Sequence, residues 1–95
     1  MNAVKLHSEK LVYDDGAIRE EVIWRVPAPV PPNQHAYKYR LVYIANGVRV
    51  IGFDNERWKG YHCHFGRTER AYNFTTLVQL IIDFRHAVEQ ERAAG

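Results

Sequence analysis

The stretch YKYRLVYIANGVRVIGFD, residues 37–54, contains two β-rich runs on either side of an Asn-Gly pair. Asn46-Gly47 between such runs is the strongest short signal for a β-hairpin, since a type I′ turn needs positive φ at both central residues. A two-residue loop sets the register along both strands and predicts that Tyr39 lies across from Asp54. The stretch therefore predicts the central antiparallel hairpin of a sheet.

Both faces of this hairpin carry apolar side chains. In the expected register, one face has Val42, Ile44, Ile51 and Phe53. The other face has Tyr39, Leu41, Tyr43 and Val50. Such a hairpin is expected to be covered by a helix on one side and partly covered on the other.

The rest of the chain supplies further strands and one helix. Four prolines between Val26 and Asn33 predict a stiff, extended crossover. Thr76 and Gln79 form a capping box, and the helix that follows has a buried stripe of Leu77, Leu80, Ile81, Phe84 and Val88. We expect strands at residues 10–14, 17–26, 37–45, 48–54 and 62–65, and a helix at residues 75–93.

Within residues 17–26, apolar side chains share one face that Glu20 interrupts, namely Ile18, Val22, Trp24 and Val26. We expect Trp24 in the core. The order of five strands and then a helix predicts an α+β fold, with residues 1–95 forming a single small domain. Its antiparallel sheet of about five strands has the Asn-Gly hairpin at its centre and one C-terminal helix packed against it.

Length and composition narrow the class of protein. At 95 residues the chain has room for one small core. No apolar run approaches the roughly 20 residues that span a bilayer, and MNAVKLHSEK at the N-terminus lacks the apolar centre of a signal peptide. The single cysteine, Cys63, has no partner for an internal disulfide. We therefore expect a cytoplasmic protein without a membrane partner.

Positive charge is concentrated in the middle of the chain. Residues 38–70 carry seven Lys or Arg against three Asp or Glu, while the segments on either side are each net −1. Such a segment fits a phosphate-bearing partner. Solvated basic side chains on the rim of a sheet would give the same composition, so charge alone leaves both interpretations open.

Three motifs together resemble one known family. They are DGAIxExVIWxVPxPVP at residues 15–31, HxYKYRLxY at residues 35–43, and GxDNERxKGxHxHxG at residues 52–66. A helix rich in Leu, Ile and Phe follows. In this order, from Asp15 to about Val88, the chain resembles the TumE-type toxins of prokaryotic type II toxin–antitoxin pairs. It departs from that pattern at Trp58, where a small residue is common, and at Tyr61, where an acid is common.

The resemblance implies a small toxin with a cognate antitoxin protein as its partner. It does not supply a reaction, so the chemistry has to come from the residues. The dense stretch Asp54–His64 contains the best candidates, and in an extended segment His62 and His64 point to the same side. Cys63 then points to the opposite side, where we expect a small buried side chain.

The hypothesis that uses most of these residues is metal-independent RNA cleavage, which would make the chain a ribonuclease. That chemistry needs a base for the 2′-hydroxyl, an acid for the leaving oxygen and cations for the charge on phosphorus. The candidate catalytic residues are His62, His64, Tyr39, Asp54 and Glu56. The candidate nucleic-acid-binding residues are Arg40, Arg57, Lys59, Lys38, Tyr37 and Trp58, with a tyrosine or tryptophan stacking on a base.

Two alternatives stay open. His62 and His64 with a carboxylate from Asp54 or Glu56 would make a His-His-carboxylate metal site, although our expectation is no metal and no cofactor. The chain could instead be a non-catalytic interaction module that binds an antitoxin and obstructs a target. The sequence also leaves a homo-oligomer open.

Overall fold

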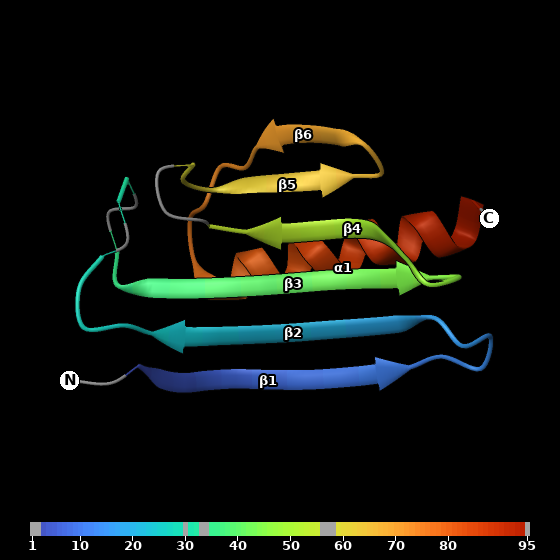
Figure 1. The fold of residues 1–95 in the computed structure, drawn as a ribbon, viewed down its shortest axis with the longest axis horizontal. Coiled ribbons are helices and arrows are strands. Elements are labelled where there is room, and N and C mark those ends of the chain that lie inside the picture. The colour runs from blue at the N-terminus through green and yellow to red at the C-terminus, as the bar shows by residue number, and fades with distance from the viewer. Residues whose placement is uncertain (1–2, 30, 33–34, 56–58, 95) are drawn as a thin grey trace.

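The computed structural model describes residues 3–29, 31–32, 35–55 and 59–94. Within this part, the chain forms a six-stranded antiparallel sheet followed by one helix. The strands are β1 Val4–Val12, β2 Ile18–Arg25, β3 Tyr37–Ala45, β4 Val48–Asp54, β5 His62–Phe65 and β6 Thr68–Ala71, and the helix is α1 Leu77–Ala94. The strands neighbour one another in sequence order, and α1 runs behind β3 and β4 (Figure 1). The α+β class, the central hairpin and the C-terminal helix are confirmed.

The structure differs from the prediction at both edges of the sheet. β1 begins at Val4 rather than at residue 10, and β6 is a sixth strand where about five were expected. All four residues of β6 are exposed, so the sequence TERA lacks the apolar alternation that marks a half-buried strand. The chain turns back into β6 at Gly66, whose φ of 61° suits glycine.

The central hairpin has the predicted turn but a different register. Asn46 and Gly47 have φ of 54° and 74°, as a type I′ turn requires. A β-bulge at Val50 then shifts the pairing, so that Tyr43 lies opposite Ile51 and Arg40 lies opposite Asp54. The predicted pairing of Tyr39 with Asp54 is therefore wrong by one residue.

The bulge also redistributes side chains between the two surfaces of the sheet. We call the surface that packs against α1 the helix face and the opposite surface the far face. The helix face of the hairpin carries Tyr39, Leu41, Tyr43, Ile51 and Phe53, which are all buried in one core. The far face carries Arg40, Val42, Gly52 and Asp54. The expected grouping of Ile51 and Phe53 with Val42 and Ile44 is wrong for the same reason.

The helix packs as its spacing predicts. Leu80, Phe84 and Val88 are buried, and Leu77 and Ile81 are partly buried against them. The Thr76 hydroxyl accepts a hydrogen bond from the Gln79 backbone N–H at 3.1 Å, which caps the helix. The Gln79 side chain donates to Asp83 instead of to Thr76, so only half of the capping box forms. The described residues include no helix long and apolar enough to cross a membrane.

β2 presents to the core the face that was expected to point away from it. Ile23 and the charged residues Arg19 and Glu21 lie on the helix face, while Ile18, Val22 and Trp24 lie on the far face. The prediction that Trp24 belongs to the core is wrong, because this side chain is only half-buried. Glu21 can be buried because Arg85 of α1 donates to both of its carboxylate oxygens at 2.8 Å.

Candidate functional site

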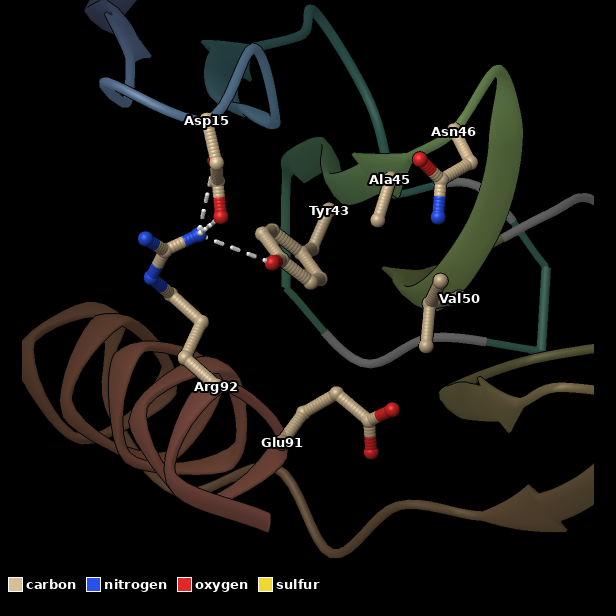
Figure 2. Close-up of a pocket in the computed structure, with 7 residues that line it drawn as sticks. All are labelled: Asp15, Tyr43, Ala45, Asn46, Val50, Glu91 and Arg92. Atoms are coloured by element: carbon tan, nitrogen blue, oxygen red, sulfur yellow. Dashed lines mark hydrogen bonds and ion pairs between the residues drawn. The ribbon is translucent and has the colours of Figure 1, made fainter. Parts of the chain in front are cut away.

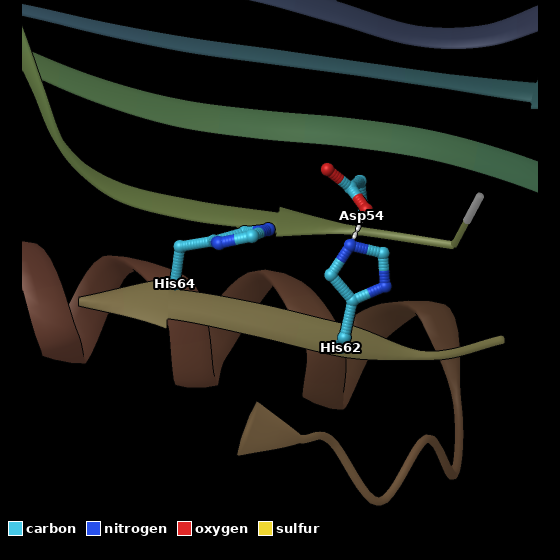
Figure 3. A group of neighbouring side chains, drawn as sticks. All are labelled: Asp54, His62 and His64. Carbon is cyan, nitrogen blue, oxygen red and sulfur yellow. Dashed lines mark ion pairs between the residues drawn. The ribbon is translucent and has the colours of Figure 1, made fainter. Parts of the chain in front are cut away.

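Asp54, His62 and His64 come together on the far face of neighbouring strands. Asp54 ends β4 directly opposite His62 of β5, and His64 lies opposite Gly52. Both imidazoles rise from β5 toward the strand that carries Asp54 (Figure 3). One ligand atom of each side chain lies within 4.8 Å of the other two. The prediction that the two histidines share one side of a strand is confirmed.

His62 is held by the protein at both ring nitrogens. Its Nδ1 lies 3.0 Å from the Gly60 carbonyl oxygen, which can only accept a hydrogen bond. Its Nε2 lies 2.5 Å from Asp54 Oδ1, so this ion pair requires a proton on one of the two groups. The His62 side chain is 4% exposed. It is therefore well placed to orient its neighbours and poorly placed to reach a large substrate.

His64 is the more accessible of the two histidines. Its ring stands at 81° to the His62 ring, with the centroids 5.0 Å apart. Its Nδ1 lies 3.6 Å from Glu69 Oε2, and the Lys59 ammonium lies 3.7 Å from the same oxygen. Its Nε2 makes no hydrogen bond or ion pair within the described part of the chain. This nitrogen is the group of the cluster best placed for proton transfer.

Two cations border the same cluster. A hollow of about 210 Å³ is lined by Lys38, Tyr39, Arg40, Asp54 and Asn55. Lys38 and Arg40 are exposed, and Arg40 lies directly opposite Asp54. Asn55 is buried and fixes this arrangement: its side chain accepts from the Tyr39 N–H at 2.9 Å and donates to the Tyr37 carbonyl at 2.7 Å. The amide thus extends the β3–β4 ladder by one position beyond Asp54.

A third cation, Arg49, was not among the site residues predicted from the sequence. A Cβ placed on Gly52 would lie 3.2 Å from Arg49 Cδ and 3.4 Å from its Nε, so the Arg49 side chain lies across the Gly52 backbone. Gly52 is opposite His64, which brings the guanidinium to the histidine side of the far face. A glycine inside a strand is the available signal, because it often marks a close approach by another group.

Residues 2–92 match the family described as Toxin TumE.

The chain belongs to the TumE toxin family.

Membership makes it a toxin of a toxin–antitoxin system and suggests an antitoxin partner. No curated protein and no solved structure matched.

Some predicted site residues of this TumE-family chain lie away from the histidines. Tyr39 is 1% exposed in the core on the helix face, where burial raises the pKa of its hydroxyl far above the ordinary value. Tyr37 packs beside His35, with the ring centroids 5.0 Å apart. Cys63 is buried on the helix face, as expected, and burial raises the pKa of its thiol. Three further candidates lie outside the described residues: Glu56, Arg57 and Trp58.

Another hollow of the TumE-family chain, of about 320 Å³, is lined by the β3–β4 hairpin, the end of α1 and Asp15 (Figure 2). Three of its polar side chains, Arg92, Tyr43 and Asp15, contact one another. Arg92 donates to the Tyr43 hydroxyl at 3.0 Å and pairs with Asp15 at 3.2 Å. The same guanidinium lies 3.7 Å above the Tyr13 ring. These contacts tie the helix end to the sheet, and the histidine cluster remains the better candidate site.

Proposed function

We propose that this toxin acts on RNA and that His64 accepts the proton of the attacking 2′-hydroxyl. The observation that supports the proposal is the position of His64 Nε2. It belongs to a half-buried imidazole with a carboxylate near its other nitrogen, beside the His62–Asp54 ion pair. An imidazole nitrogen so placed can act as the general base for a nearby hydroxyl group.

The proposed reaction needs no cofactor. As the 2′-oxygen attacks the adjacent phosphorus, its proton passes to His64 Nε2. A 2′-O–P bond forms and the bond from phosphorus to the 5′-oxygen breaks, so the products carry a 2′,3′-cyclic phosphate and a 5′-hydroxyl. Water protonates the leaving 5′-oxygen, and His64 returns its proton to solvent. Glu69, 3.6 Å from Nδ1, stabilises the imidazolium that forms in between.

We assign His62 a positioning role in place of the catalytic role that the sequence predicted. Both of its nitrogens point at protein groups, Gly60 and Asp54, and its side chain is buried. Its ring makes a T-shaped contact with the His64 ring and limits the directions in which the His64 imidazole can turn. Loss of His62 is therefore expected to act through the orientation of His64.

The basic side chains of the far face are proposed to hold the phosphate. Arg40 and Lys38 line the hollow beside Asp54, and Arg49 lies over Gly52 next to His64. Guanidinium groups suit this task because they donate two parallel hydrogen bonds to a phosphate and stabilise the charge that develops on it. The His62–Asp54 ion pair offsets the negative charge that Asp54 would otherwise direct at the same phosphate.

Induced expression in a bacterial host tests the proposal. We expect the wild-type chain to arrest growth and fragment cellular RNA, and co-expression of the antitoxin encoded beside it to restore growth. His64→Gln should lose both effects, while His86→Gln, which changes an exposed histidine on α1, should keep them. Full arrest by a folded His64→Gln variant would reject the catalytic proposal.

That last result would favour a second candidate function, binding without catalysis. Four exposed large apolar side chains lie on the edge strand β1, namely Val4, Leu6, Leu11 and Val12. An edge strand also leaves a row of backbone N–H and C=O groups open to pairing with another chain. A toxin that obstructs its target would depend on such a surface and not on an imidazole.

A further inference from the structure

We propose that Asp54, His62 and His64 also bind one divalent transition-metal ion of the Zn²⁺ type, and that the bound ion blocks His64. Two imidazoles and one carboxylate on a single side of the sheet form a three-ligand set that leaves further positions of the metal open. Their ligand atoms already lie within 4.8 Å of one another. Adjacent strands hold all three positions, so little chain entropy opposes binding.

The hydrogen bond at His62 supports this assignment. A metal-binding histidine usually donates its other ring N–H to a backbone carbonyl or a carboxylate, which fixes the tautomer and aims the free nitrogen at the metal. His62 Nδ1 has the Gly60 carbonyl at 3.0 Å and therefore presents Nε2 to Asp54. The lone pair of His62 Nε2 and the ionised Asp54 carboxylate repel each other unless a cation lies between them. That cation can be a proton, and a metal ion can take its place.

Binding requires the contact between His62 and Asp54 to open and the ligand atoms that lie up to 4.8 Å apart to move closer together. With bonds of about 2.0–2.1 Å and a tetrahedral angle, two ligand atoms on Zn²⁺ stand roughly 3.3 Å apart. The Nε2 to Oδ1 distance is 2.5 Å, so the contact has to open by about 0.8 Å. Asp54 is the last residue of β4, and its side chain is 16% exposed.

A second group of potential ligands in the described chain provides the contrast. His7, Glu9 and Glu21 also lie within 4.8 Å of one another. There Arg85 donates to both glutamates, at 2.6 Å and 2.8 Å, and Arg19 pairs with Glu9 at 3.0 Å. Guanidinium groups already supply the positive charge, so we expect no metal at that group.

The choice of ion follows from the ligands. Imidazole nitrogen suits Zn²⁺, Co²⁺ and Ni²⁺, whereas Mg²⁺ prefers oxygen ligands and keeps its waters. Blocking of His64 is the part of the inference that rests on the proposed function, since coordination uses the nitrogen that would accept the 2′-hydroxyl proton. Metal binding itself does not depend on any activity toward RNA.

Titration calorimetry of the purified, EDTA-stripped chain tests the binding. We expect one Zn²⁺ per chain, no heat from Mg²⁺, and a visible spectrum of bound Co²⁺ that reports nitrogen ligands. His64→Gln should weaken binding by at least about 100-fold, and the matched variant His7→Gln should not change it. If the buried substitution His62→Gln unfolds the chain, the half-buried His64 still provides the test, with circular dichroism as the check on folding.

Two results would overturn the inference: absence of Zn²⁺ binding, or binding that His64→Gln leaves unchanged, which would mean an adventitious site. RNA cleavage measured in parallel separates the two proposals. Cleavage in EDTA that Zn²⁺ suppresses supports both. Cleavage in EDTA without any Zn²⁺ binding removes the metal site alone. If Zn²⁺ binds stoichiometrically and cleavage requires the metal, the metal site is supported. The metal-independent reaction and the blocking of His64 are then both rejected.

Discussion

Among the described residues, replacing Glu21 by Gln should destabilise the fold more than any other change of one carboxylate to an amide. Glu21 is fully buried and joins three elements. Arg85 of α1 donates to both carboxylate oxygens at 2.8 Å, and His7 of β1 lies 2.8 Å from Oε1. Glutamine keeps the volume but replaces one accepting oxygen with an NH₂ group, which would face donors.

The expected cost follows from these contacts. Each hydrogen bond to the charged carboxylate is worth about 1.5–3 kcal/mol, and breaking a buried ion pair costs about 3–5 kcal/mol. The Arg85 side chain is 36% exposed and can recover part of its hydration. We therefore expect the free energy of unfolding to fall by about 2–4 kcal/mol, a large part of the roughly 5–15 kcal/mol of a small domain.

Urea denaturation followed by circular dichroism measures this difference. Glu20→Gln is the matched control, because Glu20 is the neighbouring residue on the far face, and it should change the unfolding free energy by less than about 0.5 kcal/mol. Equal midpoints for Glu21→Gln and Glu20→Gln would show that the buried carboxylate does not hold α1 on the sheet.

The pH dependence gives a second test of the same residue. Burial alone would raise the pKa of Glu21, but the hydrogen bonds from Arg85 and His7 outweigh it and hold the pKa below its ordinary value. A lowered folded-state pKa means that the ionised form stabilises the fold above the unfolded pKa, and that this stability is lost as pH falls through the folded pKa. The difference between wild type and Glu21→Gln should therefore shrink below about pH 4.5.

Three further substitutions have defined outcomes. Gly52→Ala should displace the Arg49 side chain and should raise the stability of the fold slightly or leave it unchanged. In fluorescence anisotropy, it should lower the slope of the logarithm of RNA affinity against the logarithm of salt concentration by about 0.7, as Arg49→Ala should. Unchanged RNA affinity would exclude Arg49 from the interface. Asn55→Ala should lower the free energy of unfolding in urea by about 1–3 kcal/mol, because it leaves the Tyr39 N–H and the Tyr37 carbonyl without partners. A smaller loss would mean that water replaces the amide. Thr76→Ala should lower the free energy of unfolding by about 1 kcal/mol, measured by thermal unfolding. No change would show that the helix cap does not stabilise the fold.

The sequence predicts those parts of the fold that depend on local patterns. Asn46-Gly47 locates the hairpin because few residue pairs tolerate two consecutive positive φ angles. The helical stripe of Leu80, Phe84 and Val88 identifies the packed side of α1. The spacing of His62 and His64 places both on one surface, because alternation along a strand is a property of the backbone.

Features that depend on distant contacts could not be predicted in this way. Glu21 lies in the core only because Arg85, 64 residues later, neutralises it, and no local pattern carries that pairing. The bulge at Val50 places Arg40, instead of Tyr39, opposite Asp54. A regular two-residue hairpin register does not predict such a bulge. Arg49 enters the candidate site because Gly52 lacks a side chain, which becomes informative only once the strands are in place.

The role of His64 is tested most directly by incubating the purified chain with single-stranded RNA in EDTA and analysing the ends of the products. The wild-type chain and His86→Gln should yield 2′,3′-cyclic phosphate and 5′-hydroxyl ends, and His64→Gln should be slower by at least about 100-fold. Equal cleavage by a folded His64→Gln variant, or intact RNA with a wild-type chain that still arrests growth, would contradict proton transfer at this histidine.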